Sequence, residues 1–185
     1  MKQNSVKSVF TALFAALIAV GSVVALPIGP VPIVLQNAFA VLAGLLLGPL
    51  QGAGAVGLFL MAGALGLPIF SGGKGGFAVL IGPTGGYLVG YFIAALVAGY
   101  AVKRASKTNI RDAFPVVLSA AIAGFVCIYI PGVLGLRKAL GLDMAQAIVK
   151  GVVPFLLADA IKIAIIVPIT LKLRPIVDRY LTPDA

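Results

Sequence analysis

The sequence predicts an all-α integral membrane protein, a single domain over residues 1–185 with six transmembrane helices. Hydrophobic residues make up 61% of the 185 residues and charged residues only 10%, and the mean hydropathy is +1.15. Soluble domains carry about a quarter charged residues. Proline, glycine and charged residues divide the chain into six apolar stretches, each near the roughly 20 residues that a helix needs to cross a bilayer core. The connections between these stretches are too short to form a soluble domain.

The predicted spans are, in chain order, about 8–26, 32–48, 51–67, 78–102, 115–135 and 149–173. The first has a basic start like a signal peptide, but it has no convincing small-x-small cleavage site, so we interpret it as the first helix. The second and third are short and are joined only by "GPLQG" (48–52). A count of five spans is therefore the alternative.

The distribution of basic residues predicts that both termini are cytoplasmic. With that orientation nine basic residues lie inside: Lys2, Lys7, Lys103, Arg104, Lys107, Arg111, Lys172, Arg174 and Arg179. Four lie outside: Lys74, Arg137, Lys138 and Lys150. Nine against four follows the positive-inside rule. The net charge of +9 is thus explained by membrane orientation, and we expect no nucleic-acid partner.

Composition also argues against an enzyme. The chain contains no His and no Glu, and its acidic residues are Asp112, Asp143, Asp159, Asp178 and Asp184. The single cysteine, Cys127, excludes an intrachain disulfide and a cysteine-ligated metal site. "GGKGG" (72–76) lacks the Ser or Thr that follows the lysine of a P-loop. We therefore expect no catalytic or metal site, and no ATP hydrolysis by this chain alone.

Two ionisable residues stand inside the last predicted span. Asp159 and Lys162 lie in "PFLLADAIKIAIIVP" (154–168), where every other residue is apolar. Residues three apart share a helix face, and on one continuous helix Asp159 would lie about 14 Å from Lys150, near mid-membrane. Ionisable residues inside membranes are usually functional, so we expect the pair to contact a ligand. The alternative is that the two charges only neutralise each other and tie helices together.

The segment between the third and fourth predicted spans is rich in glycine. "GLPIFSGGKGGFAVLIGPTGGYLVG" (66–90) holds nine glycines in 25 positions. Irregular backbone at membrane depth persists only where protein buries it or where it lines a cavity, so this segment is predicted to form a lid or wall over a pocket. A flexible outer turn is the alternative. If the segment is a lid or wall, Lys74 would attract an anionic ligand; if it is a flexible turn, Lys74 would be solvated.

Small residues recur at four-residue spacing in two places. Ala12 and Ala16, then Ala15 and Ala19, lie in "TALFAALIAVGS" (11–22), and such spacing lets membrane helices approach closely. This face could contact a partner or pack internally. The glycines at 44, 48 and 52 are interpreted as internal packing.

At these segments the sequence resembles a known family. "VPIVLQNAFAVLAGLLLGPLQGA" (31–53), the glycine-rich segment and "ADAIKIA" (158–164) are similar to the BioY family, the biotin-specific S components of energy-coupling factor (ECF) transporters. The resemblance covers most of the chain. Its specific parts are the glycine-rich segment and the D-x-x-K pair, Asp159 and Lys162.

This resemblance implies a six-helix S-component bundle in a prokaryotic cell membrane. It implies that biotin is the transported ligand rather than a cofactor. Biotin would bind near the outer face, under two segments: the loop between helices one and two, and the glycine-rich segment. The implied biotin-binding residues are Gln36, Asn37, Gly73, Lys74, Gly75, Tyr87, Asp159 and Lys162. The implied partners are a transmembrane coupling subunit, which Ala12, Ala16 and Ala19 would face, and two ATPase subunits.

The chain departs from some relatives at two positions, since the family also places Asn at position 74 and Arg at position 88. Lys74 could replace the cation that is lost at Leu88. Two other functions stay open at this point: an S component for another small vitamin, and an autonomous proton-coupled carrier in which Asp159 cycles its proton. Lys162 argues against the carrier, because a neighbouring cation keeps a carboxylate charged.

Overall fold

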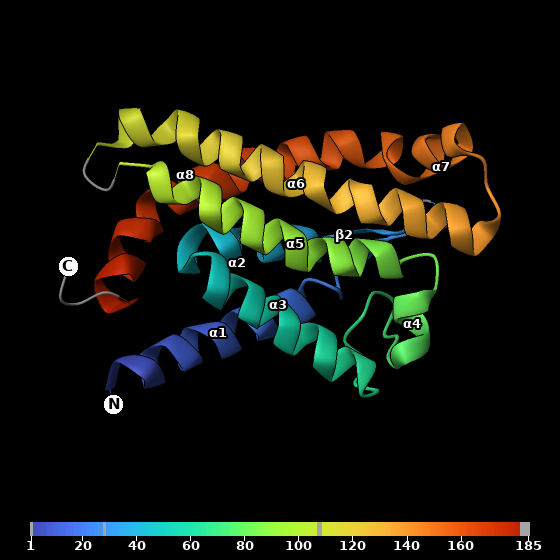
Figure 1. Ribbon diagram of the computed structural model, residues 1–185, viewed down its shortest axis with the longest axis horizontal. Helices are drawn as coiled ribbons and strands as arrows, with labels where there is room; N and C mark the ends of the chain where they lie inside the picture. The colour runs from blue at the N-terminus through green and yellow to red at the C-terminus, as the bar shows by residue number, and fades with distance from the viewer. Residues whose placement is uncertain (1, 28, 107–108, 182–185) are drawn as a thin grey trace.

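The computed structural model describes residues 2–27, 29–106 and 109–181, and its long helices run lengthwise through the molecule (Figure 1). The helices are α1 (Lys2–Val20), α2 (Gln36–Leu47), α3 (Pro49–Ala64), α4 (Phe77–Ile81), α5 (Gly85–Ala101), α6 (Ile110–Leu140), α7 (Met144–Gly151) and α8 (Leu156–Leu181), with 3-10 turns η1 (Val102–Arg104) and η2 (Val153–Phe155). Two short strands, β1 (Ala25–Leu26) and β2 (Ile33–Val34), complete the elements of the described residues. The predicted all-α class is confirmed.

Helix α2 lies at the centre of the bundle. It packs against α1, α3, α5, α6 and α8, and every residue from Gln36 to Leu47 except Phe39 is buried. A helix that is apolar around its whole circumference needs such an enclosure. Close approach depends on Gly44, where an added Cβ would lie 2.3 Å from the carbonyl oxygen of Ala95 in α5. Gly52 of α3 lies against the backbone of Gly44, so these glycines serve internal packing.

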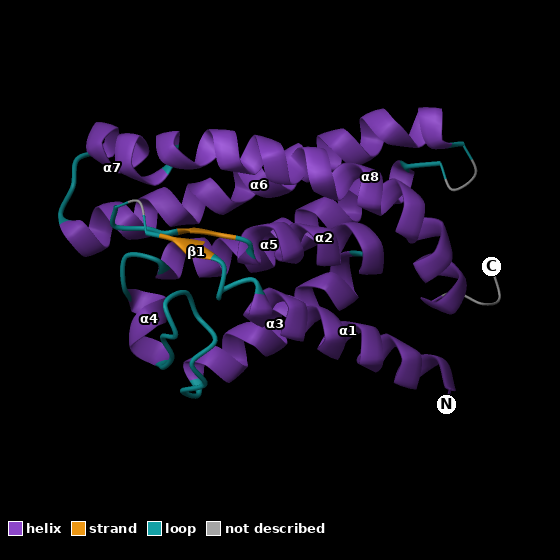
Figure 2. Cartoon of the chain, turned by 180° about the vertical axis from the view of Figure 1, so that it is seen from behind, coloured by secondary structure: helices purple, strands orange, loops and turns teal. Residues whose placement is uncertain are grey.

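The connection between α1 and α2 differs from the prediction. The first helix ends at Val20, and Ala25–Leu26 and Ile33–Val34 form an antiparallel hairpin in which Ala25 pairs with Val34. The predicted spans 8–26 and 32–48 instead place both strands at the ends of two helices. Prolines at positions 27, 30 and 32 explain the difference, because proline lacks a backbone N–H and disfavours helical geometry in the preceding residue. Figure 2 shows the hairpin close to α5.

The last predicted span is also interrupted. Helix α7 ends at Gly151, the η2 turn contains Pro154, and α8 begins only at Leu156. Asp159 therefore lies in the first turn of α8 rather than nine residues along a continuous helix. The predicted depth of about 14 Å, which assumed 1.5 Å per residue from Lys150, does not apply. Similarly, the fourth span divides into α4 and α5 at Gly82 and Pro83.

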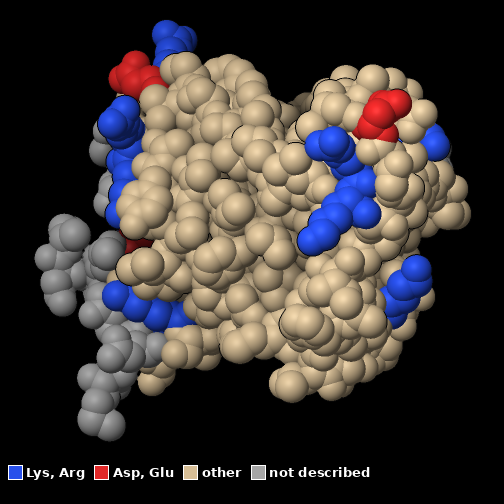
Figure 3. Space-filling view, turned by 45° about the vertical axis from the view of Figure 1, so that its right-hand side comes forward, with Lys and Arg blue, Asp and Glu red and all other residues tan. Residues whose placement is uncertain are grey.

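The lengths and composition of the helices are those of a multi-pass membrane protein. In the described residues, three helical segments are long and apolar enough to cross a bilayer: Gly85–Arg104, Ile110–Leu140 and Met144–Leu181. Three shorter apolar helices accompany them: Ser5–Val20, Gln36–Leu47 and Pro49–Ala64. Figure 3 shows Lys and Arg residues gathered toward two opposite sides of one face, with a broad uncharged surface between them.

The ends of α1 and α8 define one end of the molecule. Both the start of α1 and the end of α8 lie there, whereas α4 and α7 lie at the opposite end (Figures 1 and 2). The β1–β2 hairpin and the glycine-rich segment belong to the α4 end. We call these two the terminal end and the loop end.

Candidate ligand-binding site

The predicted ion pair is present and buried. Asp159 and Lys162 each expose only 5% of their surface, and Lys162 Nζ donates a hydrogen bond to Asp159 Oδ1 at 2.7 Å. Both residues lie on one face of α8, as their spacing of three predicts. The carboxylate also lies in the first turn of α8, where the positive end of the helix dipole favours a negative charge.

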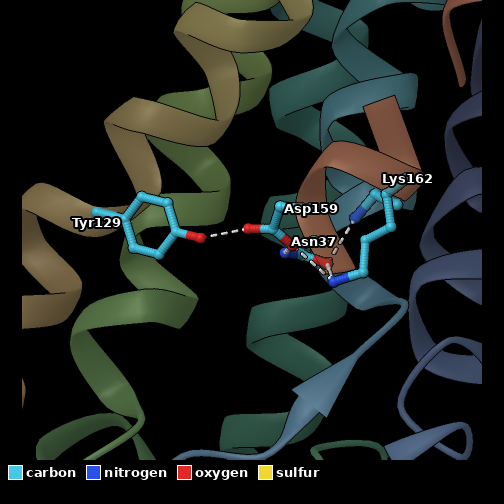
Figure 4. Close-up of polar contacts among 5 residues, drawn as sticks. Asn37, Tyr129, Asp159 and Lys162 are labelled. Atoms are coloured by element: carbon cyan, nitrogen blue, oxygen red, sulfur yellow. Dashed lines mark hydrogen bonds and ion pairs between the residues drawn. The ribbon is translucent and has the colours of Figure 1, made fainter. Parts of the chain in front are cut away.

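Two further helices contribute to this pair (Figure 4). Asn37 of α2 donates from Nδ2 to Asp159 Oδ1 at 3.0 Å, and its Oδ1 accepts from Lys162 Nζ at 3.0 Å and from the backbone N–H of Ala38 at 3.0 Å. The hydroxyl of Tyr129 in α6 donates to Asp159 Oδ2. We call Asn37, Tyr129, Asp159 and Lys162 the polar network.

The polar network places three donors around one carboxylate in an apolar bundle. Among the described residues, no buried side-chain nitrogen or oxygen lacks a hydrogen-bond partner. Breaking a buried pair by removing one partner typically costs about 3–5 kcal/mol, although an intact pair is seldom a net gain over apolar packing. The fold therefore holds the network in place, but a gain in folding stability does not explain why these charges are buried.

The polar network borders a cavity at the loop end. A cavity of about 20 Å³ is lined by Val31, Pro32, Val34, Asn37, Tyr87, Tyr91, Ile128, Tyr129, Phe155 and Asp159. A second, of about 70 Å³, is lined by Pro30, Val31, Pro32, Val34, Gln36, Phe70, Ser71, Lys74, Val79, Thr84, Tyr87, Leu88 and Tyr91. The two share the hairpin residues Val31, Pro32 and Val34 and the tyrosines Tyr87 and Tyr91. They are thus adjoining parts of one site, with the polar network at its inner end.

Tyr87 forms part of the wall between the two cavities. Its hydroxyl donates to the carbonyl oxygen of Gly151 at 2.8 Å, and its ring lies 6.3 Å from that of Phe155. Gly132 permits this position, because an added Cβ there would lie 2.4 Å from the Tyr87 ring. The hydroxyl of Tyr87 thus joins α5 to the end of α7, and its ring is the part that borders the site.

The glycine loop, residues 66–76, is anchored at its base and exposed at its tip. Phe70 exposes 1% of its surface and packs edge-to-face on Phe59 of α3, with ring centroids 5.4 Å apart. Phe70 and Lys74 exchange two backbone hydrogen bonds, of 2.9 and 3.2 Å. Gly72 and Gly73 complete the turn with φ of 76° and 69°, which glycine adopts at no steric penalty.

The structure brings five of the predicted biotin-binding residues to the cavity lining. Asn37 and Asp159 line the inner cavity, and Gln36 and Lys74 line the outer one. Tyr87 borders both. Gln36 also donates from Nε2 to the carbonyl oxygen of Ile69 at 3.2 Å, which ties α2 to the glycine loop. Leu88 lines the same cavity as Lys74, and Lys74 is the one charged residue among the described residues of that lining.

Three predicted residues lie outside that lining. Lys162 lies behind Asp159 and reaches the site only through its hydrogen bonds. Gly75 packs on the loop itself, since an added Cβ would lie 2.5 Å from the carbonyl oxygen of Leu67. Gly73 is exposed at the tip of the turn.

Sequence reasoning missed several residues that line the site: Ser71, Thr84, Tyr91 and Tyr129. Tyr129 had a usable signal, because a tyrosine in an apolar membrane segment still needs a partner for its hydroxyl. Its partner could not be inferred, since Asp159 is 30 residues away on another helix.

The predicted docking residues of α1 lie on the outer surface. Ala12 and Ala16 are exposed and Ala19 is half-buried. On the opposite face of α1, Phe14 and Ile18 are buried in the core. Small residues at positions 12 and 16 are therefore not required by packing within this chain.

Together these features define a helical membrane protein with a buried polar network that borders a cavity beneath two loops. A profile of the BioY family matches residues 1–179, and the chain belongs to that family. It is 40% identical over 162 residues to the biotin transporter BioY of Thermotoga maritima, covering 88% of this chain and 92% of that protein. It is 37% identical over 174 residues to a probable biotin transporter BioY of Pyrococcus horikoshii, covering 94% and 98%.

A solved structure shows the same fold. The crystal structure of the S-component for biotin from an ECF-type ABC transporter superposes with a TM-score of 0.82 at 31% identity. The match covers 93% of this chain and 92% of that one.

Proposed function

We propose that this chain is the biotin-binding and translocating S component of an ECF-type vitamin transporter, a transport protein rather than an enzyme. The observation that carries the proposal is the buried polar network at the inner end of a cavity between two loops, in a chain similar to biotin transporters over most of its length.

The chemistry of biotin fits this site. Its ureido ring has two N–H donors and one carbonyl acceptor, its thiophane ring and chain are apolar, and its tail is a carboxylate. Asp159 can accept from the ureido N–H groups, while Tyr91 and Phe155 supply apolar walls. Lys74, in the outer cavity, can pair with the tail carboxylate. Each polar edge of the ligand would then have a partner, which burial requires.

The dimensions of the site support a moving lid. Cavities of about 70 and 20 Å³ are small beside the roughly 300–1,000 Å³ typical of pockets for small organic ligands. A ligand of biotin's size therefore enters only if the glycine loop or the hairpin loop moves. The glycine loop is the better candidate, because residues 72–75 are exposed and Phe70 anchors only its base.

The membrane arrangement we propose has six spans, with the terminal end in the cytoplasm of a prokaryotic cell and the loop end outside. The six apolar helices support the count, and the start of α1 and the end of α8 lie at one end of the molecule (Figure 1). The excess of Lys and Arg on that side supports the orientation. The membrane would be the cell membrane, where a vitamin is taken up.

The proposed partners are a transmembrane coupling subunit and two ATPase subunits, with α1 as the docking helix. Ala12 and Ala16 are exposed, and small side chains allow close helix contact in lipid.

Ala16→Trp should abolish ATP-dependent uptake and copurification with the energising subunits, while biotin still binds the isolated chain. The matched control is Val126→Trp, since Val126 is 53% exposed on α6. Normal assembly of Ala16→Trp would exclude α1 as the docking surface.

The proton-coupled carrier is the competing function. Lys162 Nζ and Asp159 Oδ1 form a buried ion pair at 2.7 Å, and a carrier that protonated Asp159 would leave the ammonium group without its partner ion in part of each cycle. Uptake by cells expressing this chain separates the two functions. Loss of uptake on deletion of the ATPase subunits supports the S component, whereas loss only on collapse of the proton gradient supports the carrier.

Equilibrium binding of radiolabelled biotin to the detergent-purified protein tests the ligand directly. We expect saturable binding that unlabelled biotin displaces and that other small vitamins do not. Displacement by another vitamin at lower concentration than biotin would reassign the substrate. No saturable binding by folded protein would overturn the proposal.

A further inference from the structure

A further cavity, separate from the two of the candidate biotin site, lies at the terminal end, away from the polar network. It has a volume of about 310 Å³ and is lined by Lys7, Leu45, Leu46, Leu47, Gly48, Pro49, Leu50, Gln51, Gly99, Val102, Lys103, Arg174, Asp178 and Leu181. None of these residues lines the cavities of the candidate biotin site. The cavity is formed where α1, the α2–α3 turn, the end of α5, η1 and α8 meet.

The charge of this cavity is positive. Lys7, Lys103 and Arg174 contribute three positive charges and Asp178 one negative charge, a net +2 from four charged residues. Arg174 is four residues from Asp178 on α8, where such pairs face one another, and it donates to the carbonyl oxygen of Ala105 at 3.3 Å. Lys7 and Lys103 therefore carry most of the charge that is available to a ligand.

Backbone geometry adds to this potential. Gly48, Pro49, Leu50 and Gln51 line the cavity and form the start of α3, a 16-residue helix that begins with Pro49 and has no side-chain cap. Pro49 has no N–H and the Gly48 N–H donates to the Gly44 carbonyl oxygen, so Leu50 and Gln51 supply the N–H groups that an anion can meet in this first turn. The last residues of α2 line the same cavity and oppose the dipole of α3, so the two lysines remain the main source of positive charge.

The rim of the cavity is apolar and faces outward. Leu50 lines the cavity and is 72% exposed, and Tyr100, beside the lining residue Gly99, is 56% exposed. Lys103 Nζ lies 4.8 Å from the centre of the Tyr100 ring, so its charge lies against apolar surface. In a bilayer this surface meets acyl chains. A ligand with an anionic head and an apolar tail would fit both the basic cavity and its apolar rim.

We propose that this cavity binds the phosphate headgroup of an anionic phospholipid. Lys7, Lys103 and the start of α3 would hold the phosphate, and the acyl chains would lie along the apolar surface at Leu50 and Tyr100. Basic pockets between membrane helices are known to favour such headgroups. The inference rests on the geometry of the terminal end and does not depend on the identity of the transported ligand.

The test compares lipids by native mass spectrometry and by thermal unfolding of the detergent-purified protein. Cardiolipin or phosphatidylglycerol should bind and raise Tm, whereas phosphatidylcholine and inorganic phosphate should not. Lys7→Gln with Lys103→Gln should weaken the apparent affinity about 30-fold, or about 2 kcal/mol, at roughly 1 kcal/mol for each basic residue. The single variant Lys103→Gln, at an exposed position, should weaken it about 5-fold and serves if the double variant is unstable.

The matched control removes two charges at the loop end. Arg137→Gln with Lys138→Gln changes two exposed residues beside a different, open cavity and should leave lipid affinity within about 2-fold. Circular dichroism of every variant, together with its Tm in the absence of added lipid, checks that it is folded. Equal stabilisation by phosphatidylcholine, or by inorganic phosphate alone, would overturn the proposal. So would an equal loss in the control pair, which would show a general effect of net charge.

Discussion

The two sides of the candidate biotin site are built differently. Its inner side is the polar network, in which Asn37, Tyr129, Asp159 and Lys162 are fixed by helices α2, α6 and α8 and by hydrogen bonds to one another. Its outer side is the glycine loop, which is held by one buried aromatic residue, Phe70, by a short backbone bridge and by the hydrogen bond from Gln36 to Ile69. Side chains on helices keep a fixed geometry for recognition. A glycine-rich loop can move at little penalty and so admit the ligand.

The largest effect should come from the charges of the inner side. Asp159→Asn removes a charged acceptor, and Lys162→Ala leaves the carboxylate without its cation, so each should weaken biotin binding by about 2 kcal/mol or more. Biotin titration of the purified variants measures this, and circular dichroism with Tm shows whether they are folded. Lys172→Ala, at an exposed position on the same helix, is the control.

Unchanged affinity in both folded variants would contradict the assignment of the pair to recognition. Loss of folding in both would instead favour a structural role for the pair. The double variant Asp159→Asn with Lys162→Met then becomes informative, because it removes both charges and leaves no uncompensated ion.

A smaller effect should separate two tyrosines of the same site. Tyr129→Phe removes the hydroxyl that donates to Asp159, and a hydrogen bond to a charged group contributes about 1.5–3 kcal/mol. Biotin affinity should fall at least about 10-fold. In Tyr87→Phe the lost hydrogen bond is to the Gly151 carbonyl, so Tm should fall while biotin affinity changes little. The reverse pattern would mean that the hydroxyl of Tyr87 contacts the ligand and that the hydroxyl of Tyr129 is not needed for binding.

The anchor of the loop should be sensitive to one added methyl group. At Gly63 an added Cβ would lie 2.2 Å from Cζ of Phe70, and overpacking of this kind costs about 1–3 kcal/mol. Gly63→Ala should therefore lower Tm and weaken biotin binding several-fold, because the loop loses its position. Gly57→Ala, on the same helix, brings the new Cβ only to 3.7 Å from Phe92 and should preserve both quantities. Equal results for the two variants would show that Phe70 does not hold the loop.

The smallest effect should appear in the dynamics of the lid. A ligand orders a loop only when it contacts the loop differently in the two states, so amide hydrogen exchange over residues 70–86 should slow when biotin is added. Exchange in the central helix α2 (Gln36–Leu47), which is buried on all sides, should remain nearly the same. Identical exchange over 70–86 with and without biotin would count against a lid.

The helical class, the approximate positions of the apolar segments and the shared face of Asp159 and Lys162 followed from the sequence. Composition and helical periodicity are local properties, so they can be read without a partner. The first half of the glycine-rich segment forms a loop, as the sequence predicts. Its second half contains α4 and the start of α5, within the predicted fourth span, and only the break between the two helices at Gly82 and Pro83 differs from the prediction.

The tertiary structure decided which residues share the site. Asn37 and Asp159 are 122 positions apart, and only the packing of α2 against α8 brings their side chains together. Tyr129 joins them from α6 for the same reason. The break between α7 and α8 likewise depends on the surroundings, because Pro154 permits a turn while the contact of Tyr87 with Gly151 positions it. Sequence patterns record the hydrophobicity of each segment, whereas the partners of a buried polar group depend on contacts between distant segments.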